Sequence, residues 1–579
     1  MKILKITVYV IFFALAACND DFLERYPLSS LSPETYFTSE AELKAYTNSF
    51  YSLCLPGIAD GWFPGIRQGD DVAATTFPAE VTGTRTVPAS GNEWTWTALR
   101  SINFYLAHSH KCENADIRAK YDGIARFWRA FFYFDKLVRF GDVPWYDRVI
   151  EQNDEEALNR ARDSRGYVFE RMLEDIDYAI AYCPVERNPE AVTKWTALAL
   201  KSRMCLFEGT FRKYHGRTGW EEILAGCERA SDEMIRSSGY AVYTSSPDKA
   251  YREMFLTEEP NPEFVLAVTY TNAISKNHYV NLYLQGRSYS HVSMTRALFN
   301  SYLNSDGTKF TGMAGYAAKS FYESTRGRDP RLGQSIRTQG YTYPGSSEVL
   351  LTDFSASTTG YMLTKFVTNI TTINGTNALP HFRYAEVLLN FAEARAELGA
   401  ITQADINRSI KPLRDRVGMP NLDLSAANAG PDPFLADQYP RVAGDNKGVI
   451  LEIRRERRVE LFLEAMRWND ILRWREGQLL ARQARGAYFA GPGEYDIDGD
   501  GKPDLVIYSG TRPPSTIAGC QYMDISDMNL SNGTAGGEII VNPHITRTWN
   551  EERDYYYPIP LQELQLNPNL VQNPLWATE

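Results

Sequence analysis

The sequence lacks three features that would place it in common functional classes. No apolar run after the N-terminus approaches the roughly 20 residues that a membrane-spanning helix needs. Lysine and arginine number 61 against 72 acidic residues, and a chain with a net charge of −11 is not expected to bind nucleic acid. The H-E-x-x-H, G-x-S-x-G, Walker A and Rossmann glycine patterns are absent. We therefore predict that the protein is not an enzyme. A glycoside hydrolase stays as the alternative, because 72 acidic residues leave room for a catalytic pair.

Cysteine and histidine are scarce, with seven of each. No two cysteines form a C-x-x-C pair, and their spacing fits no zinc pattern. Cys183, Cys205 and Cys227 fall in or beside helical stretches, where we expect them to be buried as small hydrophobic side chains. His108 and His110 form the nearest histidine pair, but their side chains would diverge on a helix. The sequence therefore predicts no zinc site, and it identifies no particular disulfide.

The N-terminus has the pattern of an export signal. Two lysines precede a short apolar run, and small residues follow before the sequence turns acidic. Leu15-Ala16-Ala17-Cys18 resembles the bacterial lipobox, in which the cysteine is lipidated after cleavage. Several acyl chains, each CH₂ contributing about 0.8 kcal/mol, would hold the protein on a membrane. We predict a signal peptide at 1–17 and lipidation of Cys18; the alternative is an ordinary secretory signal.

Helical periodicity dominates residues 98–238. Within 116–140, apolar side chains recur at intervals of three and four residues, and Gly141 and Pro144 then follow, as helix ends prefer. Further helices are predicted at Arg165–Tyr182, Thr193–Phe211 and Trp220–Ser237. Abundant alanine and glycine allow close helix pairing, so we expect stacked helical hairpins like those of tetratricopeptide repeats.

A second helical region and long polar stretches make up the rest of the chain. Helices are predicted at Phe382–Leu398, Gln403–Val417 and Gly448–Glu476. The polar stretches are long enough to carry small strands, such as Phe264–Tyr270 and Leu505–Tyr508. The predicted fold is therefore mainly α, a tetratricopeptide-like scaffold of helical hairpins with long, loop-rich and partly β insertions. We divide the mature chain into an N-terminal helical region, 18–245, and a C-terminal region, 246–579, that completes the same globular unit.

Five separate stretches resemble the SusD/RagB family of Bacteroidetes outer-membrane lipoproteins, and they follow the family's order. They are Asp21–Pro27, Arg129–Pro144, Phe382–Arg395, Glu452–Trp474 and Tyr556–Pro560, with Gln572-Asn573-Pro574 near the end. The resemblance covers essentially the whole chain. We expect most of these stretches to be structural. The aromatic face of the helix at 116–140 indicates core, and the alternating arginines and glutamates from Glu452 to Glu460 predict a charged helix surface.

The resemblance implies a function. Members of this family are not enzymes; they sit on the cell surface over a SusC-type TonB-dependent transporter and act as the lid that captures its nutrient. The ligand is usually an oligosaccharide, and a minority of relatives handle peptides, which stays as the second alternative here. Asp20 and Asp21, just after Cys18, are similar to the signal that sends such lipoproteins to the outer face of the outer membrane.

The loop that begins at Asp496 has the spacing of an EF-hand-type calcium loop. Carboxylates occupy positions 1, 3, 5 and 9, glycine occupies position 6, and the residue at position 7 would offer its backbone carbonyl. The predicted ligands are Asp496, Asp498, Asp500, Lys502 and Asp504. Position 12 is Ile507 instead of glutamate, so further ligands would be water or distant residues. We predict one structural calcium ion and no catalytic role; the alternative is a plain acidic Asp-Gly turn.

Candidate glycan contacts lie in the N-terminal half. A sugar site needs an exposed aromatic platform with planar polar groups around it. Trp94 and Trp96 project to one side of an extended segment, at the edge of a long loop that offers further polar and aromatic residues. The candidates are Trp62, Asp70, Asp71, Arg85, Trp94 and Trp96. The family's best-known member is similar in adding an aromatic from the middle of the chain, for which Tyr283 and Tyr289 are the candidates. The alternative for Trp94 and Trp96 is that they anchor the following helix.

Overall fold

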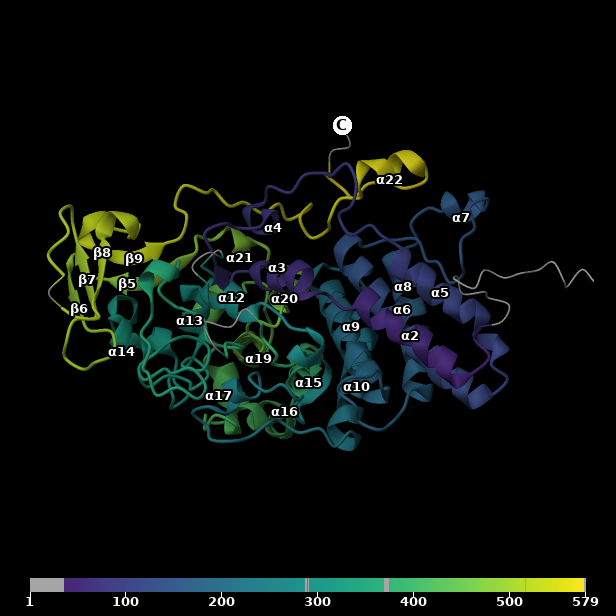
Figure 1. Cartoon of the computed structure of the whole chain (residues 1–579), viewed down its shortest axis with the longest axis horizontal. Helices are drawn as coiled ribbons and strands as arrows, with labels where there is room; N and C mark the ends of the chain where they lie inside the picture. The colour runs from purple at the N-terminus through teal and green to yellow at the C-terminus, as the bar shows by residue number, and fades with distance from the viewer. Residues whose placement is uncertain (1–35, 287–288, 290, 369–373, 516, 577–579) are drawn as a thin grey trace, which may run out of the picture.

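A computed structural model describes residues 36–286, 289, 291–368, 374–515 and 517–576. The predicted signal peptide, the lipidation site Cys18 and the acidic pair at 20–21 lie outside the described residues. The helices of residues 97–237 gather at one end of the molecule, and the strands of residues 485–540 lie at the other (Figure 1). Along the described segments, no helix has the length and apolar character that a bilayer span requires.

The helices run as follows: α2 (Glu40–Cys54), α3 (Phe63–Arg67), α4 (Ala79–Thr82), α5 (Thr97–His108), α6 (Ala115–Phe140), α7 (Glu155–Leu158), α8 (Arg165–Tyr182), α9 (Lys194–Tyr214), α10 (Trp220–Ser237), α11 (Ala250–Glu253), α12 (Val280–Gln285), α13 (Arg296–Ser301), α14 (Phe321–Thr325), α15 (Tyr384–Glu397), α16 (Gln403–Asp415), α17 (Leu424–Ala429), α18 (Pro433–Gln438), α19 (Lys447–Glu460), α20 (Arg467–Arg473), α21 (Gln478–Ala481) and α22 (Leu561–Leu566). A short π-helix, η2 (Ile58–Trp62), precedes α3. The fold is mainly helical, as the sequence predicts.

Helix α6 shows why the helical predictions succeed. The Asn114 side chain accepts hydrogen bonds from the backbone N–H groups of Asp116 and Ile117, which caps the first turn. The helix ends at Gly141, whose φ of +75° suits a residue without a Cβ and whose N–H donates to the carbonyl of Leu137. The sequence also predicts the bounds of α8 and α10 correctly.

The long helices stack in chain order. Helix α6 packs on α8, α8 on α9, α9 on α10 and α10 on α15, which in turn packs on α16 and α19. This arrangement confirms the predicted scaffold of helical hairpins. One hydrophobic cluster fills it and draws residues from both predicted regions, including Phe127, Leu200, Leu388 and Ile453.

Strands are short and lie in the loop-rich part. They are β1 (Val72–Ala73), β2 (Phe264–Val268), β3 (Ser293–Met294), β4 (Leu379–Arg383), β5 (Arg485–Phe489), β6 (Gly493–Tyr495), β7 (Leu505–Tyr508), β8 (Gln521–Asp524) and β9 (Gly537–Ile540). Antiparallel pairs form between β1 and β3, β2 and β4, and β5 and β9. In the three-stranded sheet β6–β7–β8, β7 pairs antiparallel with β6 and parallel with β8. A second hydrophobic cluster lies among these strands and loops.

Helix α19 corrects one prediction. Its alternating arginines and glutamates do not form a charged surface; they are buried, because α15, α16, α17, α18 and α13 pack around the helix. Each charge is compensated by a buried partner. Glu460 accepts from Arg331, Arg383 and Arg416 at N–O distances of 2.5 to 3.1 Å. Removing any one partner from such a cluster would leave an unpaired charge in the interior, which lowers the stability of the fold.

The helix predicted at 448–476 is also interrupted. Helix α19 ends at Glu460, a turn covers 461–466, and α20 begins at Arg467. Leu463 and Ala465 adopt positive φ values of +63° and +58°. Side-chain-bearing residues rarely take this left-handed conformation, so periodicity alone gave no sign of the turn.

The cysteine predictions agree with the structure. Cys183, Cys205 and Cys227 are buried among the helices. All six cysteines within the described residues are free.

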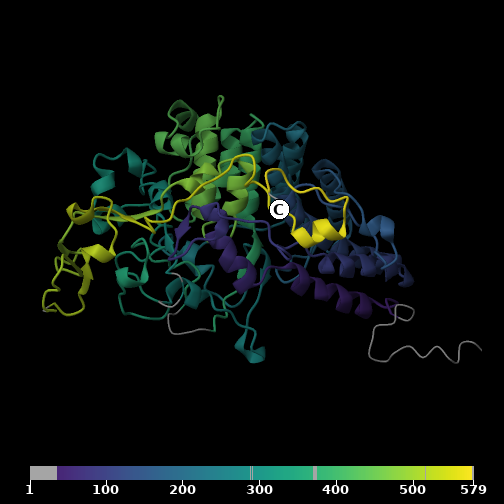
Figure 2. The same cartoon turned by 90° about the horizontal axis from the view of Figure 1, so that it is seen from above.

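The C-terminal strap, residues 542–576, runs from the strand-rich end back across the molecule to the helical end (Figure 2). The backbone N–H of Tyr557 donates to the carbonyl of Arg139 at the end of α6. The N–H of Leu561 donates to the carbonyl of Pro88. Side chains of this strap, such as Ile559, belong to the helical core.

Candidate functional site

Two of the predicted glycan contacts, Tyr283 and Tyr289, meet on one surface, where α3 and α12 approach each other near the middle of the molecule (Figure 1). We call this surface the aromatic ledge and define it as Phe63, Tyr279, Tyr283 and Tyr289. Phe63 begins α3, directly after Trp62, the last residue of η2. Tyr283 lies on α12, and Tyr279 precedes that helix by one residue.

Three rings of the ledge, those of Phe63, Tyr283 and Tyr289, contact one another in a defined geometry. Phe63 stacks on Tyr283 with ring centroids 4.3 Å apart and an interplanar angle of 16°. Tyr289 meets Tyr283 edge-on at 5.3 Å. Tyr279 and Tyr289 are 45% and 38% exposed, although aromatic side chains of this size are usually buried. The buried Phe63 therefore supports a tyrosine ledge that faces solvent.

Polar groups accompany these rings. Asp60 is exposed on η2. Burial raises the pKa of Tyr283, and the proximity of Tyr289, Asp60 and Tyr279 raises it further. The ledge thus combines ring faces with phenol hydroxyls and one carboxylate, which can donate and accept hydrogen bonds to a bound hydroxylated molecule.

Trp62 lies behind the ledge and not on its face. Its indole N–H donates to the carbonyl of Leu463 at 3.1 Å. Its ring meets Phe366 edge-on at 5.8 Å. Trp62 is half-buried, with one side directed into the second hydrophobic cluster.

The structure places Trp94 and Trp96 elsewhere, against α6. Trp94 is only 7% exposed and packs on Phe140 at 4.9 Å, so its ring offers no free face to a sugar. Trp96 packs on Tyr146 and Phe132 and immediately precedes α5. The two tryptophans thus contact each other and, through Phe140 and Phe132, helix α6, so they pack within the helical part of the structure.

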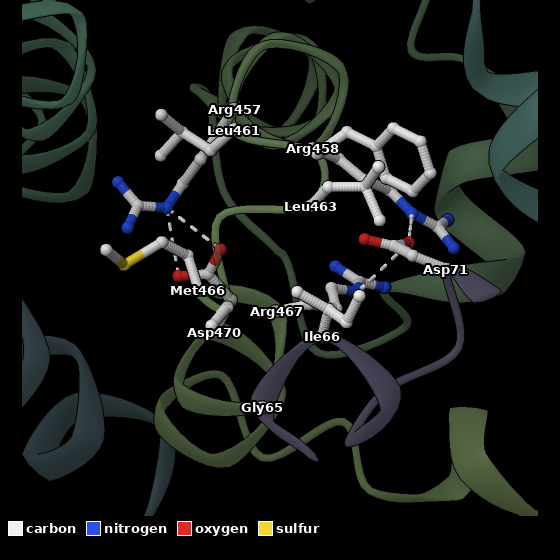
Figure 3. A pocket seen from close by; sticks show the side chains of 12 residues that line it. Gly65, Ile66, Asp71, Arg457, Arg458, Leu461, Leu463, Met466, Arg467 and Asp470 are labelled. Atoms are coloured by element: carbon white, nitrogen blue, oxygen red, sulfur yellow. Dashed lines mark hydrogen bonds and ion pairs between the residues drawn. The ribbon is translucent and has the colours of Figure 1, made fainter. Parts of the chain in front are cut away.

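Asp70, Asp71 and Arg85 are buried or nearly so and are engaged within the protein. Asp71 accepts from Arg458 at 2.6 Å (Figure 3). Asp70 accepts from Arg467 at 2.6 Å. Burial raises the pKa of Asp71 against the opposing effect of Arg458. The Arg85 guanidinium lies among the rings of Tyr557, Trp576, Trp468 and Trp549, 4.6 to 6.0 Å from their centroids. These three side chains hold the segment at 58–92, which we call the N-terminal loop, onto the rest of the molecule.

Two ledge residues were not among the sequence candidates. Tyr279 stands four residues before Tyr283, and this spacing puts two side chains on the same side of a helix. The spacing could therefore have identified Tyr279 as a candidate from the sequence. Phe63 follows Trp62 in a short segment that the sequence did not predict to be helical. Its stacking on Tyr283 joins segments 220 residues apart, which no local pattern reveals.

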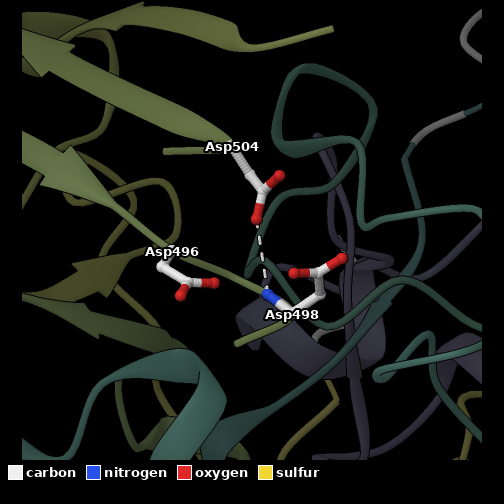
Figure 4. Close-up of side chains that lie close together, drawn as sticks. All are labelled: Asp496, Asp498 and Asp504. Atoms are coloured by element: carbon white, nitrogen blue, oxygen red, sulfur yellow. Dashed lines mark hydrogen bonds between the residues drawn. The ribbon is translucent and has the colours of Figure 1, made fainter. Parts of the chain in front are cut away.

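The predicted calcium loop lies between β6 and β7. Asp496, Asp498 and Asp504 each offer a carboxylate oxygen, and these oxygens lie within 4.8 Å of one another (Figure 4). Asp504 accepts from the N–H of Ile497 at 2.8 Å, which holds the two ends of the loop together. Burial raises the pKa of Asp504, and the negative charges of Asp498 and Asp496 add to the effect. Three converging hard oxygens fit a calcium ion.

The predicted ligand Asp500 is placed differently. One Asp500 oxygen accepts from the backbone N–H of Lys502 at 2.8 Å, and the other accepts from the Lys502 ammonium at 3.0 Å. Asp500 therefore neutralises the lysine of its own turn and does not belong to the converging group of carboxylates.

Comparisons with known proteins give a consistent result. A model of the SusD family matches residues 262–576. SusD-like protein P2 of Formosa agariphila is 24% identical over 521 residues, which cover 82% of this chain and 92% of that protein. A SusD-like protein of Bacteroides fragilis matches with a TM-score of 0.69 at 20% identity, covering 95% of this chain and 100% of that chain. A SusD-like carbohydrate-binding protein of the same species matches with a TM-score of 0.68 at 21% identity. The match covers 93% of this chain and 100% of that chain. At these identities the solved structures establish the likeness of the fold.

Proposed function

This chain belongs to the SusD family, and from that premise we propose that it captures a glycan at the cell surface and delivers it to a SusC-like TonB-dependent transporter. The observation that carries the proposal is the aromatic ledge, in which Tyr279 and Tyr289 are exposed and the half-buried Tyr283 stacks on Phe63. The carbohydrate-binding description of a structural relative supports the same ligand class.

The ledge suits a sugar for physical reasons. The C–H faces of a pyranose are apolar and stack on aromatic rings, whereas its hydroxyls need donors and acceptors at the rim. Tyrosine supplies both, because the phenol carries its hydroxyl at the edge of the ring. Asp60 adds an acceptor that can take hydrogen bonds from two hydroxyls.

We propose that the role is binding without covalent chemistry. Among the described residues, Asp60 is the carboxylate whose charge acts on Tyr283 of the ledge, whereas hydrolysis of a glycosidic bond needs two carboxyl groups placed across the bond. A glycoside hydrolase is therefore the less favoured alternative. A peptide ligand is the other, since tyrosines also bind peptide side chains.

The anchoring proposal concerns Cys18. Lipidation of this residue would tether the chain to the outer membrane, and the segment between Cys18 and α2 would link the anchor to the folded part. A Cys18→Ala variant should be released into the soluble fraction of cells, whereas the parent should partition with the membrane.

Native affinity electrophoresis of the chain from residue 19 onward tests the glycan proposal. We expect one class of polysaccharide to retard the protein without being shortened. Tyr283→Ala and Tyr289→Ala should each weaken retention about fivefold, because an aromatic contact is worth about 1 kcal/mol beyond its area. Tyr182→Ala is the matched control, since Tyr182 is 51% exposed on α8, away from the ledge.

Three outcomes would contradict the proposal. Retention by no polysaccharide, together with binding of a peptide mixture, would favour the peptide alternative. Shortening of the polymer would favour the hydrolase. Equal retention of the ledge variants and of the Tyr182 control would place the glycan site on another surface.

We also propose that the Asp496–Asp504 loop holds one structural calcium ion, through Asp496, Asp498 and Asp504. The convergence of their oxygens supports this proposal. The ion would offset the mutual repulsion of three carboxylates and fix the turn between β6 and β7.

A further inference from the structure

The turn at 461–466, between α19 and α20, holds two residues in a conformation that L-amino acids rarely adopt. Leu463 and Ala465 have φ values of +63° and +58°, with only Glu464 between them. Neither is a glycine, so both carry the steric cost of the left-handed region. Conformations of this kind persist only when the surroundings enforce them, and they concentrate at functional sites.

Buried charge enforces the turn. The Lys365 ammonium donates to the Phe462 carbonyl at 2.6 Å and to Glu464 at 2.7 Å. Arg383 donates to both Glu464 oxygens at 2.6 and 2.7 Å. The residue that follows Lys365, Phe366, is itself left-handed with a φ of +67°. The hydrogen bonds of Lys365 therefore join the turn at 461–466 to the turn that contains Phe366, and both turns include left-handed residues.

The N-terminal loop rests on this turn. The Trp62 indole donates to the Leu463 carbonyl at 3.1 Å, and the Trp62 ring contacts Phe366. A Cβ placed on Gly65 would lie 3.0 Å from the Cβ of Ala465, so α3 sits almost directly on the turn. The position of the turn thus sets the position of Trp62 and α3.

The contact between α3 and the turn is incompletely packed. Gly65 and Ile66 face Leu463 and Met466 across a cavity of about 20 Å³ (Figure 3). That volume is about the room one water molecule needs, and protein interiors seldom leave more.

The same segment supports the aromatic ledge. Trp62 ends η2, and π-helical turns are rare and often found at functional sites. Its neighbour Phe63 stacks on Tyr283 at 4.3 Å. A continuous path therefore leads from the Leu463 carbonyl through Trp62 and Phe63 to the exposed tyrosines.

We infer that Trp62 is a positioning residue: by its hydrogen bond to the strained 461–466 turn, it holds Phe63 and the tyrosine ledge in the arrangement that binds the ligand. The inference rests on the proposed glycan-binding function of the ledge. Trp62 itself acts through Phe63 and need not touch the sugar. The strained turn is retained because its left-handed backbone directs the Leu463 carbonyl toward the indole.

Two variants test the inference with the polysaccharide found by affinity electrophoresis. Trp62→Phe keeps an aromatic ring but removes the N–H donor, and we expect an affinity loss of about fivefold, the value of one hydrogen bond. Trp220→Phe is the matched control, because Trp220 begins α10 and is half-buried in the helical part. The midpoint of thermal unfolding of each variant separates loss of positioning from loss of folding.

Ala465→Gly provides the second test, in which we expect the binding affinity to change although the protein does not lose stability. Glycine relieves the left-handed strain, so the unfolding midpoint should rise. Glycine also lets the turn adopt other backbone conformations, so the Leu463 carbonyl is held less firmly toward the Trp62 indole, and affinity should fall severalfold although the unfolding midpoint rises. Asn529→Gly, at another left-handed position with φ +48°, should gain stability and keep its affinity.

The outcomes distinguish this inference from the proposed function. Wild-type affinity in both Trp62→Phe and Ala465→Gly, with loss of binding in Tyr283→Ala, would overturn the positioning role and leave the ledge as the site. Failure of the wild-type protein to bind any polysaccharide would overturn both.

Discussion

Glu476 is a buried acid whose charge is poorly compensated. It follows α20, and one oxygen accepts from Arg441 at 3.2 Å. The other lies 3.9 Å from the Arg454 guanidinium, which stacks on the ring of Trp474 at 4.3 Å. Burial raises the pKa of Glu476 to about 7, and the two arginines only partly oppose the shift. Glu551, bound to Arg441 at 3.1 Å, adds negative charge nearby.

This shift predicts a pH dependence of stability. Between pH 4.5 and about 7 the folded chain holds a proton on Glu476 that the unfolded chain has lost. Stability from this group is therefore present at low pH and is lost as the pH rises, by up to about 3 kcal/mol. Glu476→Gln should remove this contribution.

Urea unfolding of both proteins at pH 5 and pH 7.5 measures the effect as a difference. The difference is needed because other groups titrate in the same range. Burial lowers the pKa of His215 to about 3, so its contribution rises with pH up to about 6.5. Parallel pH profiles of the wild type and Glu476→Gln would contradict the prediction.

Single residues also show where sequence reasoning stops. Trp94 and Tyr289 are both aromatic residues in or near polar stretches, and only the packing of distant segments decides that one is buried and the other exposed. The arginines of α19 look like a surface pattern, because a buried charge and an exposed charge have the same local sequence. Their partners, such as Asp71 and Asp432, lie far away or outside the helix.

At the scale of elements, long helices were the most predictable part. Helices α8 and α10 have strong apolar periodicity, and their bounds follow from it. Strand β7 was predicted correctly, whereas two-residue strands such as β1 carry too few residues for any pattern. The 461–466 turn was missed because nothing in its sequence marks the left-handed conformation.

The β6–β7 loop allows a test of metal binding. We expect millimolar calcium to raise the midpoint of thermal unfolding and EDTA to abolish the increase, because a ligand that binds only the folded state stabilises it. Asp498→Asn should remove the calcium effect. Asp500→Asn should keep it, since Asp500 is paired with Lys502 outside the converging carboxylates.

Either of two results would contradict the calcium proposal. A midpoint unchanged by calcium in the wild type would leave the loop as a plain acidic turn. Equal loss of the calcium effect in both variants would mean that Asp500 is a ligand, as the EF-hand spacing suggested.

At the scale of the whole molecule, the C-terminal strap holds distant parts together. Trp576 packs over Arg85 of the N-terminal loop and over Arg553 of the strap, at 5.4 and 4.6 Å. Asn573 donates to the carbonyls of Phe140 and Tyr557. The helical core thus includes residues from both the early helices and the strap.

Substitution of Trp576 tests whether the strap holds these distant parts together. Trp576 is 7% exposed, and Trp576→Ala should lower the free energy of unfolding by about 3 kcal/mol and speed proteolysis of the strap. Leu575→Ala is the matched control, because Leu575 is 59% exposed and should change neither quantity. Identical unfolding curves for the two variants would show that the strap contributes little to stability.

The charge cluster around Glu460 has a consequence for how this fold can change. Glu460 has three arginine partners from three different segments, Arg331, Arg383 and Arg416. Replacing one partner leaves uncompensated charge in the interior, whereas replacing a whole buried ion cluster with apolar side chains of similar volume can be neutral. Each single step away from the present arrangement is therefore unfavourable, although the endpoint need not be. The cluster can be exchanged only as a unit, and it restricts the mutational routes open to the centre of the protein.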